Sequence, residues 1–292
     1  MDIVITFVNG LDPEWQKSYE THTKTPIIEK RFRDCGTLKL LMSGIEKNLP
    51  FIRKVHLVVS QESQIPQWVN RENVNIVLHR NIIPSTFLPT FNSNTIELHL
   101  HRIKGLDEEF LYFNDDMFPV TPAQPEDFFR NGKAVIKFTK HWFALNMFKK
   151  ICNNSYKLAC KASEKKYSKP FLRPQHICSP MLRSCCEEVY RKVKSEILTS
   201  ISLTRNDENY TQYLFLDYMF LNDRVINEKI EKKHFSLAIT SAEKIIRFIT
   251  HPTRKMVCIN DVRLSERRYK KLHKAIINAF NIRFPNKSKY EI

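Results

Sequence analysis

The sequence predicts an α/β protein with a Rossmann-like sheet in its first half and a mostly helical second half. Between residues 2 and 114, short apolar runs that suit buried strands alternate with segments of helical periodicity. Beyond about residue 140 the chain is Lys-rich, and its apolar residues mostly recur at helical spacing. With 42% hydrophobic residues, the 292-residue chain can bury a sizeable core. We expect one domain over 1–292, with an α/β part at 1–145 and a mostly helical part at 146–292.

Strands and helices alternate in the α/β part. Residues 2–8, DIVITFV, form a buried strand that ends at the turn-forming NGLDPEW. Ligand sites in open α/β sheets lie at the carboxyl ends of strands, so Asn9 and Asp12 occupy a suggestive place. The other predicted elements are helices at about 34–48 and 92–104, the second capped by Asn92 or Ser93, and strands at 54–60, 74–79 and 109–114.

The second part is predicted to contain several helices and one short strand. Residues 146–170 are polar and basic and suit a mobile loop over a site. Ser179 as N-cap and Pro180 at the first helical position indicate a helix start. The remaining elements are an apolar helix at 209–221, a strand at 256–261, and a last helix at 265–280 with apolar residues on one side and basic residues around it.

The net charge of +16 fits an anionic partner, whether nucleic acid, a membrane surface or a phosphorylated substrate. Nucleic acid is disfavoured because the sequence has no zinc-finger spacing, no basic-region heptads and no RNP-like aromatic pattern. Only 5 glycines occur and no Gly-rich phosphate loop is present, so side chains and a metal must hold any nucleotide. The basic last helix suits an anionic membrane surface, and equally a packed helix with a solvated charged face.

Cysteine usage and the amino terminus indicate a cytoplasmic protein. The seven cysteines form no CxxC pair and no regular framework, which is typical of free thiols in a reducing compartment. Adjacent Cys185 and Cys186 lie in a helical pattern and suit core packing. No run of about 18 apolar residues is present, and MDIVITFVNG lacks the composition of a secretory signal.

Two adjacent carboxylates, Asp115 and Asp116, follow the apolar strand at 109–114. Two unpaired charges about 4 Å apart repel by roughly 4 kcal/mol at an effective dielectric near 20, so a cation should offset them. Mg²⁺ or Mn²⁺ suits this place, because these ions take oxygen ligands and keep positions open for substrate phosphates. In the alternative reading, one Asp caps a turn and the other faces solvent.

Two further groups of polar residues could carry chemistry. On the predicted helix at 92–104, Asn94, Glu97 and His101 fall on one stripe opposite an apolar one, which indicates either a site or a solvated face. Downstream, single polar residues recur in short motifs: Arg173 and His176 in LRPQH, Arg205 ahead of an apolar helix, and Asn260 with Asp261 in IND. Arginine for phosphate, histidine for proton transfer and aspartate for metal together suit phosphoryl transfer.

Several stretches resemble, in order, the four conserved blocks of the Stealth family. They are DIVITFVNGLDPEW, RFRDCGTLKLLMSGIEKNLPFIRKVHLVV, IIPSTFLPTFNSNTIELHLHRIKGLDEEFLYFNDDMF, RPQH and CIND, and the first two blocks cover about residues 1–120. The family comprises bacterial capsular polysaccharide phosphotransferases and the lysosomal-enzyme N-acetylglucosamine-1-phosphotransferase of animals. The resemblance implies a single catalytic domain with a glycosyltransferase-A-like, nucleotide-sugar-binding core and a divalent metal, Mg²⁺ or Mn²⁺.

The resemblance also implies roles for individual residues. Catalytic roles fall to Asp115, Asp116, His176, Arg205, Glu97 and His101, with Asp115 and Asp116 at the metal. Substrate-binding roles fall to Asn9, Asp12, Arg33, Asp34, Asn92, Asn94, Arg102, Arg173, Asn260 and Asp261. The first block commonly reads WVDGSDP, so the uncharged Asn9 cannot be a strong metal ligand. The third block reads NDEN here, which leaves the roles of Asp207 and Glu208 open.

The implied reaction moves hexose- or N-acetylhexosamine-1-phosphate from a nucleotide-diphosphate sugar, expected to be UDP-linked, to a hydroxyl of a glycan or lipid-linked glycan. It forms a phosphodiester in capsular or surface polysaccharide and releases the nucleoside monophosphate. A conventional metal-dependent glycosyltransferase, which releases the diphosphate, is the alternative. A basic binding protein is a third reading, and it predicts steeply salt-dependent binding without turnover.

Overall fold

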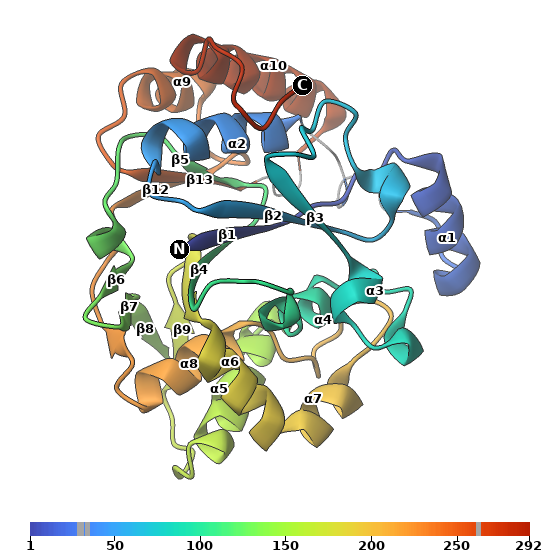
Figure 1. Cartoon of the computed structure of the whole chain (residues 1–292), viewed down its shortest axis with the longest axis vertical. Helices are drawn as coiled ribbons and strands as arrows, with labels where there is room; N and C mark the ends of the chain where they lie inside the picture. Colours follow the sequence, from blue (N-terminus) through green and yellow to red (C-terminus); the bar gives the residue numbers. More distant parts are fainter. Residues whose placement is uncertain (28–31, 33–35, 261–263) are drawn as a thin grey trace.

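A five-stranded sheet runs through the centre of the molecule in the computed structural model (Figure 1), which describes all residues except 28–31, 33–35 and 261–263. Its strand order is β10-β4-β1-β2-β3, with β10 antiparallel to β4 and the other neighbours parallel. The strands are β1 (Asp2–Thr6), β2 (Lys54–Val59), β3 (Val74–Leu78), β4 (Glu109–Phe113), β5 (Met117–Pro119), β6 (Phe129–Arg130), β7 (Lys133–Val135), β8 (Phe138–His141), β9 (Phe171–Pro174), β10 (Ser179–Leu182), β11 (Val225–Ile226), β12 (Lys232–Ser236) and β13 (Met256–Asn260).

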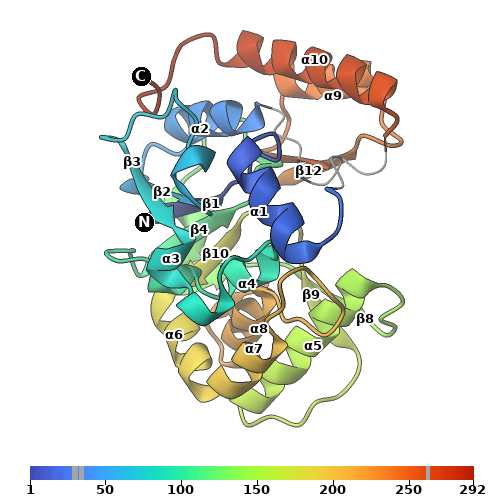
Figure 2. The same ribbon diagram turned by 90° about the vertical axis from the view of Figure 1, so that its right-hand side faces the viewer.

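Helices cover both faces of this sheet (Figures 1 and 2). They are α1 (Pro13–Thr23), α2 (Thr37–Asn48), α3 (His79–Ile82), α4 (Ser93–Glu97), α5 (Met147–Ala162), α6 (Arg183–Lys192), α7 (Lys194–Ser200), α8 (Tyr213–Leu221), α9 (Ala242–Thr250) and α10 (Glu266–Arg283), with 3-10 turns η2 (Glu62–Gln64), η3 (Ser85–Phe87), η4 (Leu100–Arg102) and η5 (Pro125–Asp127). In both views α2, α9 and α10 lie above the sheet and α5 to α8 lie below it. The predicted α/β class, with a parallel sheet and a mostly helical second half, is confirmed.

The central strands are mostly apolar because both sheet faces are covered. Ile3, Val4 and Ile5 of β1 are fully buried, as are Phe110 and Leu111 of β4. Segments far apart in the sequence complete this core, since β10 from the second half pairs with β4, and a small sheet of order β12-β13-β5 joins residues 232–260 to the segment that follows β4. Because β1 pairs with β4 in parallel, the carboxyl ends of these two strands lie side by side.

The predicted helix at 92–104 is wrong in its second half. The α-helix ends with Glu97, and a separate 3-10 turn, η4, follows at Leu100–Arg102. The imidazole Nδ1 of His99 donates to the carbonyl of Thr95 at 2.7 Å, the acceptor that the His99 amide would use in a continuing helix. The His99 amide bonds to the Ile96 carbonyl instead. The predicted stripe is therefore divided between two elements.

Two predictions for the second half are also wrong. Residues 147–162 of the predicted mobile loop form α5, which Asn146 caps by accepting a hydrogen bond from the Lys149 amide at 2.9 Å. Ser179 and Pro180 begin β10 rather than a helix, and α6 starts at Arg183. A proline is tolerated in β10 because this strand lies at the edge of the sheet. Pairing with β4 thus overrides the local helix-start signal.

The last helix, α10, is amphipathic as predicted. Its apolar side chains, Tyr269, Leu272, Ile276 and Phe280, are buried, while the five predicted basic residues, Arg267, Arg268, Lys270, Lys271 and Lys274, are exposed. The helix packs against α9 and α2, so it is a packed helix with a solvated charged face. No helix among the described residues is long and apolar enough to cross a membrane.

The cysteines outside the masked segments are free and buried: Cys152, Cys160, Cys178, Cys185, Cys186 and Cys258. This confirms the prediction of free thiols for these six, and the core-packing prediction for adjacent Cys185 and Cys186 on α6. Burial raises the pKa of the Cys178 and Cys258 thiols, because a thiolate is poorly solvated there.

Candidate active site

A cavity of about 470 Å³ lies at the carboxyl ends of β1 and β4. This is the position expected for a ligand site in an open α/β sheet. Its walls come from distant parts of the chain: the segment after β1, α4, the turn after β4, the segment after β9, the loop before α8, β13 and α10. Its polar and charged lining includes Ser93, Glu97, Asn114, Asp115, Asp116, His176 and Arg205.

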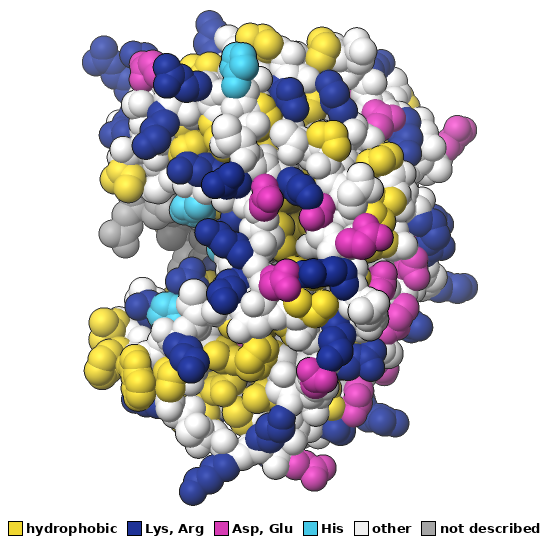
Figure 3. Space-filling model, turned by 90° about the vertical axis from the view of Figure 1, so that its left-hand side faces the viewer, with side chains coloured by type: hydrophobic (Ala, Val, Ile, Leu, Met, Phe, Trp, Pro, Cys, Tyr) yellow, Lys and Arg dark blue, Asp and Glu magenta, His cyan; other side chains and the backbone are white. Residues whose placement is uncertain are grey.

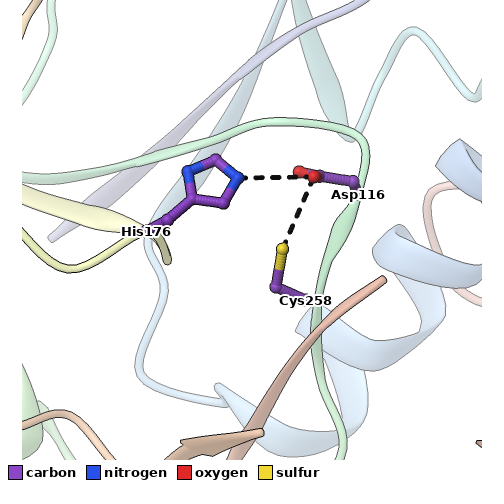
Figure 4. A group of neighbouring side chains, drawn as sticks. All are labelled: Asp116, His176 and Cys258. Carbon is purple, nitrogen blue, oxygen red and sulfur yellow. Dashed lines mark hydrogen bonds and ion pairs between the residues drawn. The ribbon is translucent and has the colours of Figure 1, made fainter. Parts of the chain in front are cut away.

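Asp116 lies between two other possible metal-binding side chains, His176 and Cys258 (Figure 4). Its Oδ2 atom is 3.5 Å from His176 Nε2 and accepts a hydrogen bond from the Cys258 thiol at 3.5 Å. Its Oδ1 atom is buried and has no hydrogen-bond partner within the described part of the chain. A carboxylate oxygen, an imidazole nitrogen and a thiol sulfur lie within 4.8 Å of one another, so these side chains could hold a metal ion.

The structure therefore brings together two predicted site residues, Asp116 and His176, which are 60 positions apart. β4 ends at Phe113 and the chain turns, so that Asp115 and Asp116 both line the cavity. His176 reaches the same cavity from the segment after β9.

Arg205 supplies positive charge to the lining. Its Nη2 atom donates to Ser93 Oγ at the start of α4, and its Nε atom is buried without a hydrogen-bond partner among the described residues. Asn92, one residue before α4, donates through Nδ2 to Asn209 Oδ1 at 2.9 Å and to Ser202. Asn92 therefore holds the loop of Arg205 through hydrogen bonds to one residue before the arginine, Ser202, and one after it, Asn209.

Glu97 is a buried acid beside this arginine. Thr211 Oγ1 and the amide of Gln212, at 3.3 Å, donate to its Oε2 atom. Burial raises the pKa of Glu97, and this shift is opposed by the Thr211 hydrogen bond and by the charge of Arg205. Glu97 lines the cavity and joins α4 to the start of α8, so it holds two cavity walls together.

The two other residues of the stripe, Asn94 and His101, and the neighbouring Arg102 have surroundings of a different kind. Asn94 is buried, with no hydrogen-bond partner for its Nδ2 atom among the described residues, and Arg102 is exposed. His101 packs against the rings of Tyr190 and Phe215, at centroid distances of 5.0 and 5.6 Å. None of these three side chains is among those that line the cavity. The break in the predicted helix turns His101 into the core.

Replacing His101 by Phe should leave turnover within about twofold and should flatten the acid side of the stability profile. Burial, followed by His99, Arg102 and Arg183, lowers the pKa of His101 to about 3. Because an unfolded His titrates near 6.5, protonation of the unfolded chain removes stability as the pH falls below that value. At pH 5 this single group costs on the order of 2 kcal/mol. Thermal unfolding at pH 7 and pH 5, with kcat at pH 7, measures both effects.

The matched control is His251→Phe, which changes an exposed histidine outside the cavity. Its kcat at pH 7 should equal that of the unchanged protein. A large loss of kcat in His101→Phe with an unchanged fold would restore His101 to the catalytic group.

The predicted residues at the end of β1 have structural contacts. Asp12 caps α1 by accepting from the Glu14 amide at 3.1 Å, and its other oxygen accepts from Ser63 Oγ and Gln64 Nε2, both at 2.6 Å. The Asn9 side chain accepts from the Leu11 amide at 2.9 Å. Neither is among the side chains that line the cavity.

The remaining predicted residues are divided between the cavity and its surroundings. Asn260 lines the cavity at the end of β13. Arg173 lies in β9, with its guanidinium 5.1 Å from the centre of the Phe148 ring, and is not part of the lining. Asp207, whose role the sequence left open, pairs with Lys150 at 2.7 Å, and Glu208 is exposed. Arg33, Asp34 and Asp261 lie outside the described residues.

Sequence reasoning missed the aromatic lining and one thiol. Tyr269 and His273 of α10 line the cavity and stack with ring centroids 5.5 Å apart. Trp15, Phe32 and Phe91 form another aromatic wall. For α10 the sequence contains a signal, because Tyr269, His273 and Ile276 fall at i, i+4 and i+7 and so share one face of the helix. The same spacing is also typical of core packing, so it does not by itself indicate a cavity wall. Cys258 had one signal, its place in the CIND stretch, but the resemblance implied no role for the thiol.

This fold and cavity define an α/β protein with a polar, phosphate-compatible site at the carboxyl edge of its sheet. Residues 31–136 match the family model described as Stealth protein CR2, conserved region 2. The receptor polysaccharide phosphotransferase WefC of Streptococcus oralis is 32% identical, over 74% of this chain and 76% of its own length. The capsular polysaccharide phosphotransferase WcwK of Streptococcus pneumoniae is 29% identical, over 100% of this chain and 99% of its own length. The chain belongs to the Stealth family.

A solved structure is also similar in outline. The galactosyltransferase LgtC, in complex with donor and acceptor sugar analogs, matches with a TM-score of 0.41 and 10% identity, covering 94% of this chain and 96% of the other.

Proposed function

We propose that this protein, as a single catalytic domain, transfers hexose- or N-acetylhexosamine-1-phosphate from a UDP-linked sugar to a glycan hydroxyl in capsular or surface polysaccharide. The observation that carries the proposal is the convergence of Asp116, His176 and Arg205 on one cavity at the carboxyl edge of the parallel sheet. Membership of a family whose relatives are named polysaccharide phosphotransferases supports it. An arginine, a histidine and a carboxylate in one site suit phosphoryl transfer.

Arg205 is the proposed phosphate ligand. Its Nη2 atom is fixed by Ser93, and its Nε atom is buried without a partner among the described residues, so this N–H can donate to a phosphoryl oxygen. The loop is held by Asn92 and Asn209, which means that little side-chain freedom is lost on binding. Such fixed positive charge stabilises a transition state whose phosphoryl oxygens carry negative charge.

His176 is the proposed general base, with one of the carboxylates as the alternative. The acceptor oxygen forms a bond to the β-phosphorus, and the bond from that phosphorus to the oxygen bridging to the α-phosphate breaks. The hydroxyl proton passes to the imidazole of His176, and the nucleoside monophosphate leaves. Asp116 Oδ2, 3.5 Å from His176 Nε2, stabilises the imidazolium that forms.

The residues fit a divalent metal ion, for which we propose Mg²⁺ or Mn²⁺ held by Asp115 and Asp116. The buried, unpartnered Oδ1 atom of Asp116 supports this, because an ionised oxygen without a donor needs a cation. Cys258 is a poor ligand for such ions, which prefer oxygen, and burial keeps its thiol protonated by raising its pKa. A bound ion would neutralise charge on the donor diphosphate.

We place the reaction in the cytoplasm, at the inner face of the membrane. The six described cysteines are free, which supports a reducing compartment, and an acceptor glycan linked to lipid would be presented there. Nucleic acid is not among the proposed partners.

The nucleotide released decides between the two transfer reactions. With a UDP-sugar panel, an acceptor glycan and Mg²⁺, we expect UMP to accumulate in step with phosphodiester formation, because attack at the β-phosphorus leaves the α-phosphate on the nucleoside. Anion-exchange chromatography of the nucleotides measures it. The controls are a reaction without acceptor and one with chelator. Release of UDP with an acceptor-linked sugar and no phosphorus in the product would select the conventional glycosyltransferase.

A further inference from the structure

A row of large apolar side chains is exposed in the segment between β8 and α5. Trp142 is 59% exposed, Phe143 68%, Leu145 81% and Met147 47%, all within six consecutive positions. In Figure 2 this segment projects at the right edge of the molecule. Figure 3 views the molecule from the opposite side, so this edge is on the left. Hydrophobic side chains gather there, below a hollow in the surface. Soluble proteins rarely expose contiguous apolar patches of this kind unless they contact a partner or a membrane.

The segment is held in place at its base. β8 pairs with β9 up to His141 opposite Phe171, and Asn146 caps α5. The ring of Phe148 is anchored by the guanidinium of Arg173 at 5.1 Å and by Tyr213 at 6.0 Å. Because both ends are fixed, the four apolar side chains stay outside the core and need little ordering when they bind.

The charge around the segment is positive. No Asp or Glu occurs between Asp127 and Glu164, whereas Lys137 and Lys140 are exposed on the strand side. Lys149 follows on the helix side, beside Lys150, which pairs with Asp207 at 2.7 Å. Apolar tips bordered by lysines are the composition of a surface that enters an anionic lipid interface, where the lysines reach the phosphates.

We propose that residues 142–148, the docking loop, insert into the interface of an anionic bilayer and hold the protein on it. The loop suits lipid better than glycan, because sugars need hydrogen-bonding groups and the Asn146 side chain is engaged in capping α5. The bilayer contact thus lies in the loop rather than on the basic helix α10, whose apolar side is buried.

The docking loop is connected to one wall of the cavity through β8 and β9. β9, the strand that pairs with β8, ends at Pro174, and His176 enters the cavity two positions later. Docking would bring the His176 side of the cavity near the lipid surface. The inference does not depend on the reaction proposed above, since its test reads lipid binding and needs no turnover.

The test is cosedimentation with vesicles that contain phosphatidylglycerol, compared with pure phosphatidylcholine vesicles. The full chain should bind the anionic vesicles, and the double variant Phe143→Ser, Leu145→Ser should partition about tenfold or more weakly, because two exposed side chains lose their burial in lipid. Ile282→Ser is the matched control, since it removes a side chain that is 71% exposed on α10. It should bind as the unchanged chain does.

Trp142 gives a second readout that does not rely on a variant. The other tryptophans, Trp15 and Trp68, are buried and half-buried, so Trp142 is the most accessible of the three. Lipids brominated on the acyl chain should quench its fluorescence, and Trp142→Phe should abolish most of that quenching. The proposal would be overturned if the protein did not bind the vesicles, or if Ile282→Ser lost as much vesicle binding as the double variant. It would also be overturned if soluble glycan, and not lipid, changed the Trp142 fluorescence. The same holds if the protein bound no lipid but associated with itself, and the double variant abolished that self-association.

Discussion

Replacing Asp116 by Asn should lower kcat by about a thousandfold at saturating Mg²⁺. The variant keeps the size of the side chain, and its amide oxygen can still accept the Cys258 thiol hydrogen bond, so folding should be retained. What it loses is the charge beside His176 and the buried oxygen that has no partner among the described residues. Initial rates of UMP release over a range of Mg²⁺ and Mn²⁺ concentrations measure the effect.

Two other carboxylate variants make this test specific. Asp115→Asn changes the neighbouring cavity residue, and a comparison of the metal dependence of the two variants divides the metal role between them. Asp127→Asn is the control, because Asp127 pairs with Lys255 at 2.7 Å and is not part of the cavity lining. Near-normal turnover in Asp116→Asn, with the fold confirmed by thermal unfolding, would defeat the assignment of Asp116.

Replacing Arg205 by Met should lower kcat by about a thousandfold or more, since fixed arginines at transferred phosphoryl groups contribute on the order of 10³ to 10⁵ in rate. The loop should keep its position, because Asn92 and Asn209 hold it without the guanidinium. Arg205→Lys keeps the charge but loses the planar fork, so it should recover only part of the rate. Steady-state kinetics with varied UDP-sugar separate kcat from KM.

Arg224→Met is the matched control, because Arg224 is exposed and is not among the residues that line the cavity. It should be active at the level of the unchanged protein. If Arg205→Met raises KM while kcat stays the same, the arginine binds donor and transition state equally, and its proposed role at the transferred phosphate is wrong.

Strong periodic segments were predictable from sequence. The strands at 2–8, 54–60, 74–79 and 109–114 were recognisable because buried parallel strands are apolar on both faces. The helices α2 and α10 were recognisable from their apolar stripes. The 16-residue helix α5 was not, because its sequence is polar and basic between its apolar positions. The local start signal at Ser179 and Pro180 was outweighed by pairing with β4, which is a tertiary contact.

Part of the site was also predictable. The position of Asp115 and Asp116 after an apolar strand placed them at the carboxyl edge of the sheet, where the cavity lies. The stripe through Asn94, Glu97 and His101 failed because the His99 ring takes the Thr95 carbonyl and ends the helix early. Glu97 therefore reaches the cavity, and His101 packs in the core.

By itself, the sequence determined the α/β class, the acidic pair at the end of a central strand and the resemblance to the Stealth family, because these depend on local periodicity and on order along the chain. Only the tertiary structure decided which polar residues share a cavity, since Asp116, His176, Arg205 and the α10 aromatics are brought together by pairing and packing between distant segments. It also decided that the apolar row at 142–148 stays outside the core, because burial depends on what packs against a segment and not on its own composition.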